Sequence, residues 1–359
     1  MAGKLMHAVQ YSSYGGGAAG LKHVEVPVPS AKRDEVLLKL EATSLNAADW
    51  KIQKGILRPL FPRRFPYIPG DSLLSLCGFF VRGVEVGPGV TNFKTGDKVV
   101  AILSHCLVKA FDAYEFFLLA CNIANLRHII ESGRLAEFVV AKKSLSVARP
   151  PEVSAAEGAG LPVAGLTAHQ ALTQSAGVKL DGSGNRKNIL ITAASGGVGH
   201  YAVQLAKLGN THVTATCGAR NIEFVKSLGA DEVLDYKTPE GAALKSPSGK
   251  KYDAVIHCAA GVPWSTFEPN LSENGKVIDI TPGPSAIMTF AFKKLTFSKK
   301  QLVPLFMTPK GENLNYLVNL VKEGKLKTVI DSEHPLSRAE DAWANSIDGH
   351  ATGKIIMEQ

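Results

Sequence analysis

The chain reads Asn188-Ile-Leu-Ile-Thr-Ala-Ala-Ser-Gly-Gly-Val-Gly-His-Tyr-Ala-Val-Gln-Leu-Ala-Lys207 near its middle. It begins with an apolar run of strand length, continues through a glycine-rich turn, and takes up the apolar spacing of a helix from Tyr201. Glycines let the backbone turn tightly and approach a ligand without a clash at Cβ. The following helix points its free N–H groups and positive dipole end toward the turn. This order predicts a binding site for the diphosphate of a dinucleotide, with an ordinary strand-to-helix turn as the alternative.

Strands and helices alternate around this turn, from about residue 155 to about residue 309. Strands are expected at 212–216, 232–235, 253–257 and 276–280. A helix is expected at 221–228 and should end at Gly229, because glycine readily adopts the left-handed conformation found at helix ends. Repeated strand–helix–strand units imply a parallel, doubly wound sheet of the Rossmann type, which is an α/β fold.

The flanking regions have a different pattern. Residues 4–100 are rich in short alternating runs such as Glu35-Val-Leu-Leu-Lys-Leu-Glu41, which predict half-buried strands. After residue 309 we expect helices at 312–323 and around 337–347, and a strand at 354–357. The sequence therefore predicts two domains, a β-rich domain formed by residues 1–154 and 310–359 and a Rossmann domain formed by residues 155–309.

The end of the second Rossmann strand indicates which dinucleotide is bound. An NAD site usually carries an acidic residue about 20 residues beyond the glycines, where it bonds the ribose 2′-hydroxyl. Here the strand ends Thr216-Cys-Gly-Ala-Arg-Asn221, without a carboxylate. Arg220 is placed to meet a 2′-phosphate, with Asn221 as a neutral donor, so NADPH is favoured over NADH. The alternative for Arg220 is a solvated residue at a helix start, and Tyr236 is either a phosphate or adenine contact or a tyrosine at the rim.

Composition sets the broad class. The chain has 359 residues, 45% of them hydrophobic and 20% charged, which is typical of a globular protein. The net charge of +8 fits a basic soluble surface, a phosphate-bearing ligand or an acidic membrane surface, and the chain shows no nucleic-acid motif. Five cysteines without a Cys-x-x-Cys indicate a reducing compartment, and no signal sequence or membrane-spanning run is expected.

Several short motifs add a family resemblance. They are Ser44-Leu-Asn46, Asp49-Trp-Lys51, Ile68-Pro-Gly70, Gly96-Asp-Lys-Val99, Leu135-Ala-Glu-Phe138, Leu161-Pro-Val-Ala-Gly-Leu-Thr-Ala168, the glycine turn, Leu228-Gly-Ala-Asp231 and Gly353-Lys-Ile-Ile356. Together they resemble the quinone oxidoreductase branch of the medium-chain dehydrogenase/reductase superfamily, and more narrowly its plant chloroplast-envelope group. The resemblance implies a GroES-like catalytic domain beside the Rossmann domain. It also implies an NADPH-dependent reductase of α,β-unsaturated carbonyls (oxoenes and alkenals) or of quinones.

The resemblance also implies site residues. Asn46 and Lys51 are the candidate catalytic residues, with Asn46 facing the nicotinamide region and Lys51 also touching the coenzyme. Thr167 would start the helix beneath the cleft between the domains. The remaining candidates for coenzyme contact are Ser195, Gly196, Gly197, Val198, Gly218, Ala219, Arg220, Asn221, Tyr236, Ile280, His350 and Ala351.

No metal is expected at this site. Zinc-dependent relatives carry a cysteine where this chain has Asn46, together with a Gly-His-Glu that this chain lacks. Without thiolate and imidazole ligands a catalytic zinc has no anchor. Hydride transfer to an activated C=C builds charge on the carbonyl oxygen, which Asn46, Lys51, a ribose hydroxyl or a backbone N–H would stabilise, while water or a tyrosine supplies a proton. A quinone reductase and an NADPH-binding protein of low activity remain alternatives. Phe65, Tyr67, Phe290 and Phe292 are candidates for an apolar substrate pocket or for the core.

Two stretches depart from the family pattern. Residues 72–83 replace a short small-residue strand, and residues 106–132 form an apolar excess where the family has a short glycine-rich loop. One hypothesis is that both are intron-derived sequence; the other is that residues 110–130 form an amphipathic helix that docks on a membrane. The plant resemblance implies peripheral attachment to the inner membrane of the chloroplast envelope. It leaves homodimer formation open.

Overall fold

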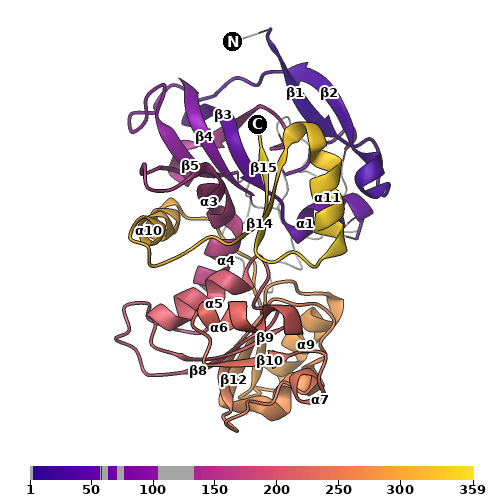
Figure 1. The fold of residues 1–359 in the computed structure, drawn as a ribbon, viewed down its shortest axis with the longest axis vertical. Coiled ribbons are helices and arrows are strands. Elements are labelled where there is room, and N and C mark those ends of the chain that lie inside the picture. The colour runs from indigo at the N-terminus through magenta and orange to yellow at the C-terminus, as the bar shows by residue number, and fades with distance from the viewer. Residues whose placement is uncertain (1–2, 57, 59–63, 71–76, 104–132) are drawn as a thin grey trace. The chain divides into compact units, whose positions relative to one another are not determined.

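The computed structural model describes residues 3–56, 58, 64–70, 77–103 and 133–359, which form two compact units (Figure 1). Unit 1 contains residues 1–163, 308–325 and 330–359, and unit 2 contains residues 164–307 and 326–329. The described parts of the two stretches that depart from the family pattern are residues 77–83. Residues 72–76 and 106–132 lie outside the described residues.

Unit 1 is built on β-sheet. Within its described residues a seven-stranded sheet has the order β14-β15-β3-β4-β5-β7, with β6 paired to β3, and β1 and β2 form a separate hairpin. The elements are β1 (Leu5–Gln10), β2 (Lys22–Pro27), β3 (Glu35–Ser44), α1 (Ala47–Lys54), β4 (Cys77–Val86), β5 (Lys98–Leu103), β6 (Phe138–Lys142), β7 (Ser146–Ala148), α3 (Ala155–Gly160), α10 (Gly311–Lys322), β14 (Ile330–Pro335), α11 (Ala339–Asp348) and β15 (Lys354–Glu358).

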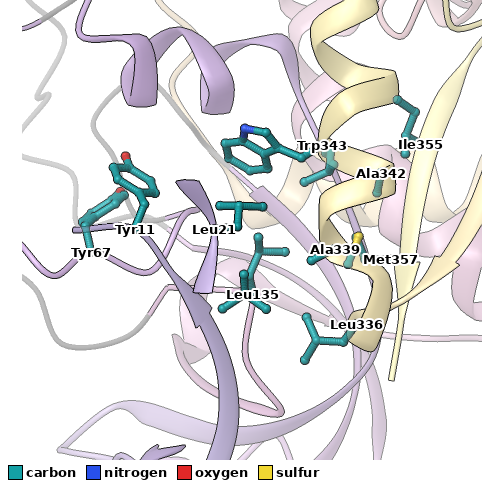
Figure 2. Packing of buried hydrophobic residues seen from close by; sticks show 12 residues of the cluster. Tyr11, Leu21, Tyr67, Leu135, Leu336, Ala339, Ala342, Trp343, Ile355 and Met357 are labelled. Carbon is teal, nitrogen blue, oxygen red and sulfur yellow. The ribbon is translucent and has the colours of Figure 1, made fainter. Parts of the chain in front are cut away.

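The C-terminal segment completes the core of unit 1. Ala339, Ala342 and Trp343 lie three and four residues apart, so they share one face of α11 and are fully buried. Figure 2 shows Trp343 packed beside Leu21, with Leu135 and Met357 in the same cluster. The indole N–H of Trp343 donates to Gln53 Oε1 of α1 at 2.8 Å, which satisfies a buried polar group. These contacts place the C-terminal segment in unit 1.

Unit 2 holds a parallel sheet of six strands in its described residues, in the order β10-β9-β8-β11-β12-β13. Ile189, Leu190 and Ile191 of β8 are fully buried, which is typical of a central strand covered on both faces. The elements are α4 (Leu166–Gln170), β8 (Asn188–Ile191), α5 (Gly199–Leu208), β9 (His212–Cys217), α6 (Ile222–Ser227), β10 (Glu232–Asp235), α7 (Pro239–Ala242), β11 (Tyr252–His257), α8 (Trp264–Phe267), β12 (Leu271–Asp279), α9 (Pro284–Leu295) and β13 (Gln301–Pro304).

Two segments lie in different units from those we assigned from the sequence. Residues 155–163 lie in unit 1, because α3 and the residues after it pack on its sheet, where Val163 contacts the cluster of Val36, Leu38 and Leu40. Residues 326–329 lie in unit 2, because the Thr328 hydroxyl bonds the Tyr201 hydroxyl of α5 at 2.8 Å. Side-chain packing across the chain, rather than local pattern, decides both assignments.

Residues 77–83 lie in a paired strand. They form most of β4, which pairs antiparallel with β3 from Val36↔Val86 to Thr43↔Phe79 and with β5 from Cys77↔Leu103 to Arg82↔Lys98. A deletion of residues 72–83 would therefore remove most of a strand between β3 and β5. Among the described residues no helix is long and apolar enough to cross a membrane.

Candidate functional site

The glycine turn leaves β8 and leads directly into α5. Ala193 has a φ of 48°, the Gly196 N–H donates to Ala193 O at 3.0 Å, and the Ala194 N–H donates to Thr216 O of β9 at 2.8 Å. A Cβ on Gly199 would lie 2.3 Å from Ala193 O and 2.6 Å from Ala194 Cα, so only glycine lets the helix begin here. Val198 at the helix start makes no side-chain capping bond, so the N-terminal end of α5 remains suited to an anion.

The predicted coenzyme residues of unit 2 gather at the carboxyl edge of the parallel sheet. Ser195 to Val198 follow β8, Gly218 to Asn221 follow β9, Tyr236 follows β10, and Ile280 follows β12. Ligands of doubly wound sheets bind at this edge, next to the point where the strand order reverses, which here lies between β8 and β11. The structure therefore brings these residues to one edge of one sheet.

The segment after β9 is at least partly exposed to solvent at the residues predicted to contact the 2′-phosphate. Arg220 is exposed, and Tyr236 is 47% exposed with its ring against Gly218, where a Cβ would lie 3.6 Å from Tyr236 Cε1. The Asn221 N–H donates to Gly218 O at 2.9 Å, which holds the turn. The nearby carboxylate of Asp235 accepts from the N–H of Lys237 at 3.0 Å. The residues 218–221 themselves carry one positive side chain and no acidic one.

Two residues that were not predicted from the sequence stabilise the carboxyl edge of this sheet. The Thr192 hydroxyl lies 2.9 Å from His257 Nδ1 and accepts from the Cys258 N–H at 2.9 Å, so it ties the ends of β8 and β11 together. Burial lowers the pKa of His257 to about 4, so its imidazole is neutral at physiological pH. These contacts fix the strand end from which the glycine turn starts.

In unit 1 the candidate catalytic residues Asn46 and Lys51 lie at α1. Asn46 is half-buried and immediately precedes the helix, and its N–H donates to Asp49 Oδ2 at 2.8 Å. Lys51 is half-buried on α1, with Nζ 5.9 Å from the centre of the Trp50 ring. Asn46 therefore precedes α1, and Lys51 lies in the last turn of the same short helix.

A buried lysine that the sequence analysis assigned no role contacts Asn46. Lys354 opens β15 and is only 3% exposed. Its Nζ donates to Asn46 Oδ1 at 2.7 Å and to Leu45 O at 2.9 Å. Burial and, to a lesser extent, the nearby charge of Arg134 lower the pKa of Lys354, Asp49 opposes both, and the net pKa is about 7. In the sequence, the only indication of this contact is a lysine at the start of an otherwise apolar terminal strand. A lysine at that position is common at exposed strand ends, so it does not indicate a functional residue.

A buried ion pair supports the start of α1. Arg134 Nη2 donates to Asp49 Oδ2, and the two side chains are 0% and 2% exposed. The partners lie 85 residues apart in the sequence, so no local pattern links them. Asp49 therefore receives both the guanidinium and the Asn46 N–H, which joins the ion pair to the candidate site.

The other predicted site residues are distributed between the units. Thr167 is buried near the start of α4 in unit 2, whereas His350 is exposed and Ala351 packs on the core cluster of Trp343 in unit 1. Among the aromatic candidates, Tyr67 is core and Phe65 packs against the same cluster. Phe290 packs against the core of unit 2, while Phe292 on the same helix is 62% exposed.

The residues around Asn46 do not fit a catalytic zinc. A metal ion bound to the Asn46 amide oxygen would share that oxygen with Lys354 Nζ, which donates to it at 2.7 Å, and two positive groups at one oxygen repel each other. Across the part of the chain that the structure describes, no group of three or more His, Cys, Asp or Glu side chains is placed to hold a metal ion.

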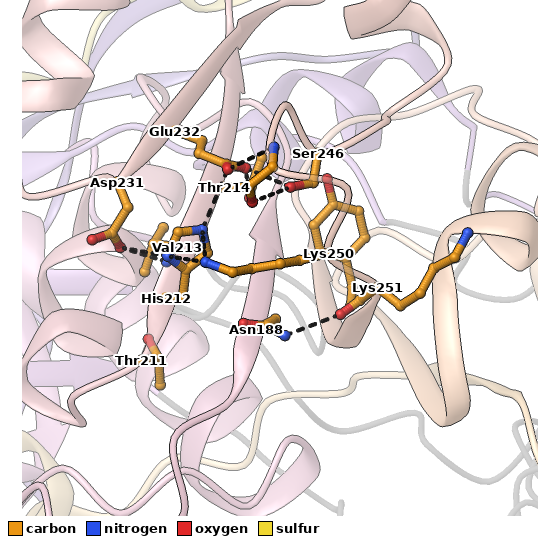
Figure 3. Close-up of polar contacts among 12 residues, drawn as sticks. Asn188, Thr211, His212, Val213, Thr214, Asp231, Glu232, Ser246, Lys250 and Lys251 are labelled. Atoms are coloured by element: carbon orange, nitrogen blue, oxygen red, sulfur yellow. Dashed lines mark hydrogen bonds and ion pairs between the residues drawn. The ribbon is translucent and has the colours of Figure 1, made fainter.

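In unit 2, a polar cluster lies at the edge of the parallel sheet opposite the glycine turn, and its role is structural (Figure 3). Glu232 opens β10 and accepts from Thr214, Ser246 and the Ser248 N–H at 2.8, 2.7 and 3.1 Å. His212 Nε2 lies 3.6 Å from the same carboxylate. Burial alone would raise the pKa of Glu232, but the hydrogen bonds outweigh it and bring the pKa to about 2. Because His212 and Glu232 start their strands, the cluster lies away from the carboxyl edge of the sheet.

Glu232→Gln is expected to destabilise the protein by about 1–3 kcal/mol near pH 7, because the amide cannot accept the same three bonds. The folded pKa of about 2 lies below the ordinary value of 4.5, so the stabilisation is present above 4.5 and is lost as pH falls toward 2. The difference in unfolding free energy between wild type and variant should therefore shrink on acidification. Urea unfolding of both proteins at several pH values measures this. Glu223→Gln, at an 85% exposed side chain, is the matched control and should be neutral.

Comparison with known proteins agrees with this geometry. The family model described as alcohol dehydrogenase GroES-like domain matches residues 32–151, and the model described as zinc-binding dehydrogenase matches residues 228–357. The chloroplast envelope quinone oxidoreductase homologue of Arabidopsis thaliana is 70% identical over 358 residues, covering 100% of both chains. The chloroplastic NADPH-dependent alkenal/one oxidoreductase of Arabidopsis thaliana is 30% identical, covering 99% of this chain and 80% of the relative.

A solved structure matches over nearly the same length. The quinone oxidoreductase from Coxiella burnetii superposes with a TM-score of 0.78 at 30% identity, covering 99% of this chain and 100% of the other. The fold and these matches define a pyridine-nucleotide-dependent oxidoreductase with a GroES-like domain and a Rossmann domain. Within that class, the chain belongs to the medium-chain dehydrogenase/reductase superfamily, in its quinone oxidoreductase branch. The predicted family and fold class are confirmed.

Proposed function

We propose that this oxidoreductase is a zinc-independent, NADPH-dependent reductase of α,β-unsaturated carbonyl compounds. The observation that carries the proposal is the Asn46 amide, held by Lys354 in the place where zinc-dependent relatives have a cysteine. An amide that donates hydrogen bonds suits a developing oxyanion, whereas it offers a metal ion a weak ligand beside a positive charge. The alkenal/one oxidoreductase at 30% identity supports the substrate class.

The coenzyme fits the residues of unit 2. A Cβ at Gly199 would lie 2.3 Å from Ala193 O and 2.6 Å from Ala194 Cα, so the turn requires glycine. The N-terminal end of α5 beside it suits the diphosphate. We assign the 2′-phosphate to Arg220 and Asn221, with Tyr236 beside them. When bound, NADPH supplies the hydride for the reaction.

The chain's own residues act on the substrate carbonyl. As negative charge develops on the carbonyl oxygen, an N–H of Asn46 Nδ2 stabilises it, and the positive charge of Lys51, on the helix that follows Asn46, adds to this stabilisation. The α-carbon takes its proton from water or from a tyrosine. Binding and orientation are therefore the main contributions of the protein.

A quinone is the second candidate substrate, and the name of the relative at 70% identity favours it. The purified protein is assayed for NADPH oxidation with a long-chain enone, with a quinone, and with neither. Consumption of the enone with formation of the saturated ketone supports the proposal. If only the quinone is reduced, the protein is a quinone reductase. Coenzyme binding without reduction of the enone or the quinone would contradict both candidate functions.

Arg220→Ala is expected to weaken NADPH binding about 10–100-fold and to leave NADH binding nearly unchanged, because the lost contact is charge-assisted and reaches only the 2′-phosphate. Fluorescence titration with each coenzyme measures both affinities. Arg186→Ala is a matched control, because Arg186 is also exposed in unit 2 but precedes β8, at the other edge of the sheet. Equal losses for both coenzymes, or none, would reject the NADPH assignment.

For the compartment, the names of the close relatives support the chloroplast, and we propose a peripheral position at the inner envelope membrane. The net charge of +8 favours anionic lipid. Flotation with anionic and neutral vesicles tests this, and salt-sensitive binding to the anionic vesicles alone is expected. Equal flotation with both vesicle types, or with neither, would contradict the electrostatic attachment.

We also propose that the protein forms a homodimer through unit 2. Met288, Phe292, Leu295 and Phe297 are 62–93% exposed on and just after α9, beside β13 at the end of the sheet order. A strand that ends the sheet order among the described residues, next to an apolar patch, suits a second copy of the chain, because pairing of the edges would bury both. Analytical ultracentrifugation should give twice the chain mass, and Leu295→Lys should shift it to monomer. A monomeric wild type would overturn the proposal.

A further inference from the structure

The lysine that opens β15 is an unusual group for a protein interior. Lys354 is 3% exposed, and its Nζ donates to one backbone carbonyl and one side chain, Leu45 O and Asn46 Oδ1. Buried ammonium groups are costly unless they are bonded and balanced by opposite charge. The nearest charged groups are Arg134 and Asp49, which bond each other, so Lys354 has no dedicated counter-ion among the described residues. A lysine retained under these conditions suggests a role beyond stability.

The contact with Asn46 determines which way that amide points. An asparagine amide has an oxygen that accepts and an NH₂ group that donates, and the two ends are similar in shape. A lysine ammonium only donates, so it must bond the oxygen. The 2.7 Å contact from Lys354 Nζ therefore fixes Oδ1 toward β15 and turns Nδ2 the other way. Nδ2 is buried and has no hydrogen-bond partner within the described part of the chain.

We propose that Lys354 is a positioning residue that locks the Asn46 amide with its NH₂ group presented to the carbonyl oxygen of the substrate. This inference rests on the proposed function, since it assigns the donor for the oxyanion of the same reaction. A buried donor without a partner costs free energy in the absence of substrate. A carbonyl oxygen that accepts from Nδ2 removes that cost, and it gains more as negative charge develops on the oxygen.

The surrounding contacts hold the backbone of Asn46 independently of Lys354. Asp49 Oδ2 accepts from the Asn46 N–H at 2.8 Å, and Arg134 bonds the same carboxylate. Removal of the Lys354 ammonium therefore leaves α1 anchored, while it frees the rotation of the amide and takes one donor from Leu45 O. A loss of activity in such a variant reports the orientation of the amide rather than the loss of the helix.

Lys354→Met keeps the length of the side chain and removes its donor. We expect kcat with an enone to fall about 10–100-fold, less than the roughly 100–1,000-fold cost of removing an oxyanion donor, because Nδ2 stays present but loses its fixed orientation, while NADPH affinity stays within twofold. Asn46→Asp should retain the contact with Lys354 and fold normally, yet it presents an oxygen in place of the NH₂ group, so an equal or larger loss is expected. Asn46→Ala completes a double-mutant cycle, in which Lys354→Met adds nothing further. Lys354→Arg, which keeps a donor, should restore part of kcat.

A second measurement does not depend on turnover. Binding of the saturated ketone to the coenzyme complex, followed by calorimetry, should weaken about tenfold in Lys354→Met and in Asn46→Asp, the value of one net hydrogen bond. Additive losses in the cycle, or wild-type kcat and ketone affinity in Lys354→Met, would overturn the proposal. If wild type binds the ketone through Lys354 and Asn46 but reduces no enone, the proposed function fails and the positioning role stands.

Discussion

Replacement of Arg134 by methionine is expected to lower the free energy of unfolding by about 3–5 kcal/mol, the usual cost of breaking a buried ion pair by removing one partner. Arg134 is fully buried, and Asp49 would keep its charge without the guanidinium. The side chain also lies over Gly70, where a Cβ would come within 2.2 Å of Arg134 Cγ, so its aliphatic part fills a close-packed space. Thermal and urea unfolding of the purified variant measure the loss.

A double variant separates charge from packing. With Arg134→Met and Asp49→Asn together, neither member of the ion pair is left charged without the other, so a large part of the lost stability should return. Lys143→Met is a matched control, because Lys143 bonds the exposed carboxylate of Asp34 at the surface and its loss should cost less than about 1 kcal/mol. A single Arg134→Met variant as stable as wild type would show that this ion pair contributes nothing to folding.

The second large effect is expected at the glycine turn. Gly199→Ala should weaken dinucleotide binding at least about 100-fold, because the new Cβ would lie 2.3 Å from Ala193 O and force the turn away from α5. Both coenzymes should be affected alike, in contrast to Arg220→Ala, because the diphosphate is common to both. Titration with NADPH and NADH measures the change.

Gly283→Ala provides the matched control for this substitution. Gly283 also precedes a helix of unit 2 and has a φ of −92°, and a Cβ added there would meet no atom within 4 Å. Alanine there should leave coenzyme affinity unchanged. If Gly199→Ala binds NADPH as tightly as wild type, the turn before α5 does not hold the diphosphate.

Much of the Rossmann unit could be predicted because its signals are local. The strand expected at 232–235 is β10 residue for residue, and the helix expected at 312–323 in the other unit differs from α10 by one residue at each end. The predicted stop at Gly229 is matched by its φ of 106°. The period of the apolar residues, the position of a glycine and the length of an apolar run are all properties of neighbouring residues. They can therefore be recognised without knowledge of the fold.

The parts that were not predicted depend on distant residues. β13 is only four residues long and ends in proline, so its pairing with β12 has little local signature. The ion pair of Arg134 with Asp49 and the contact of Lys354 with Asn46 span 85 and 308 residues. For the same reason the sequence motifs selected Asn46 as a candidate but gave no indication of the lysine that orients it.

The path of the chain between its two units limits how the protein can be divided. Residues 326–329 belong to unit 2 although the segments on both sides belong to unit 1. Besides the bond from Thr328 to Tyr201, the Lys327 N–H donates to Gln204 Oε1 at 2.8 Å. Expression of residues 164–307 as an isolated fragment would therefore strip α5 of these partners. An isolated coenzyme-binding unit would need residues 326–329 joined to residues 164–307. A chimaera with a single junction between these two stretches would take them from different parents, so the contacts between them would be mismatched.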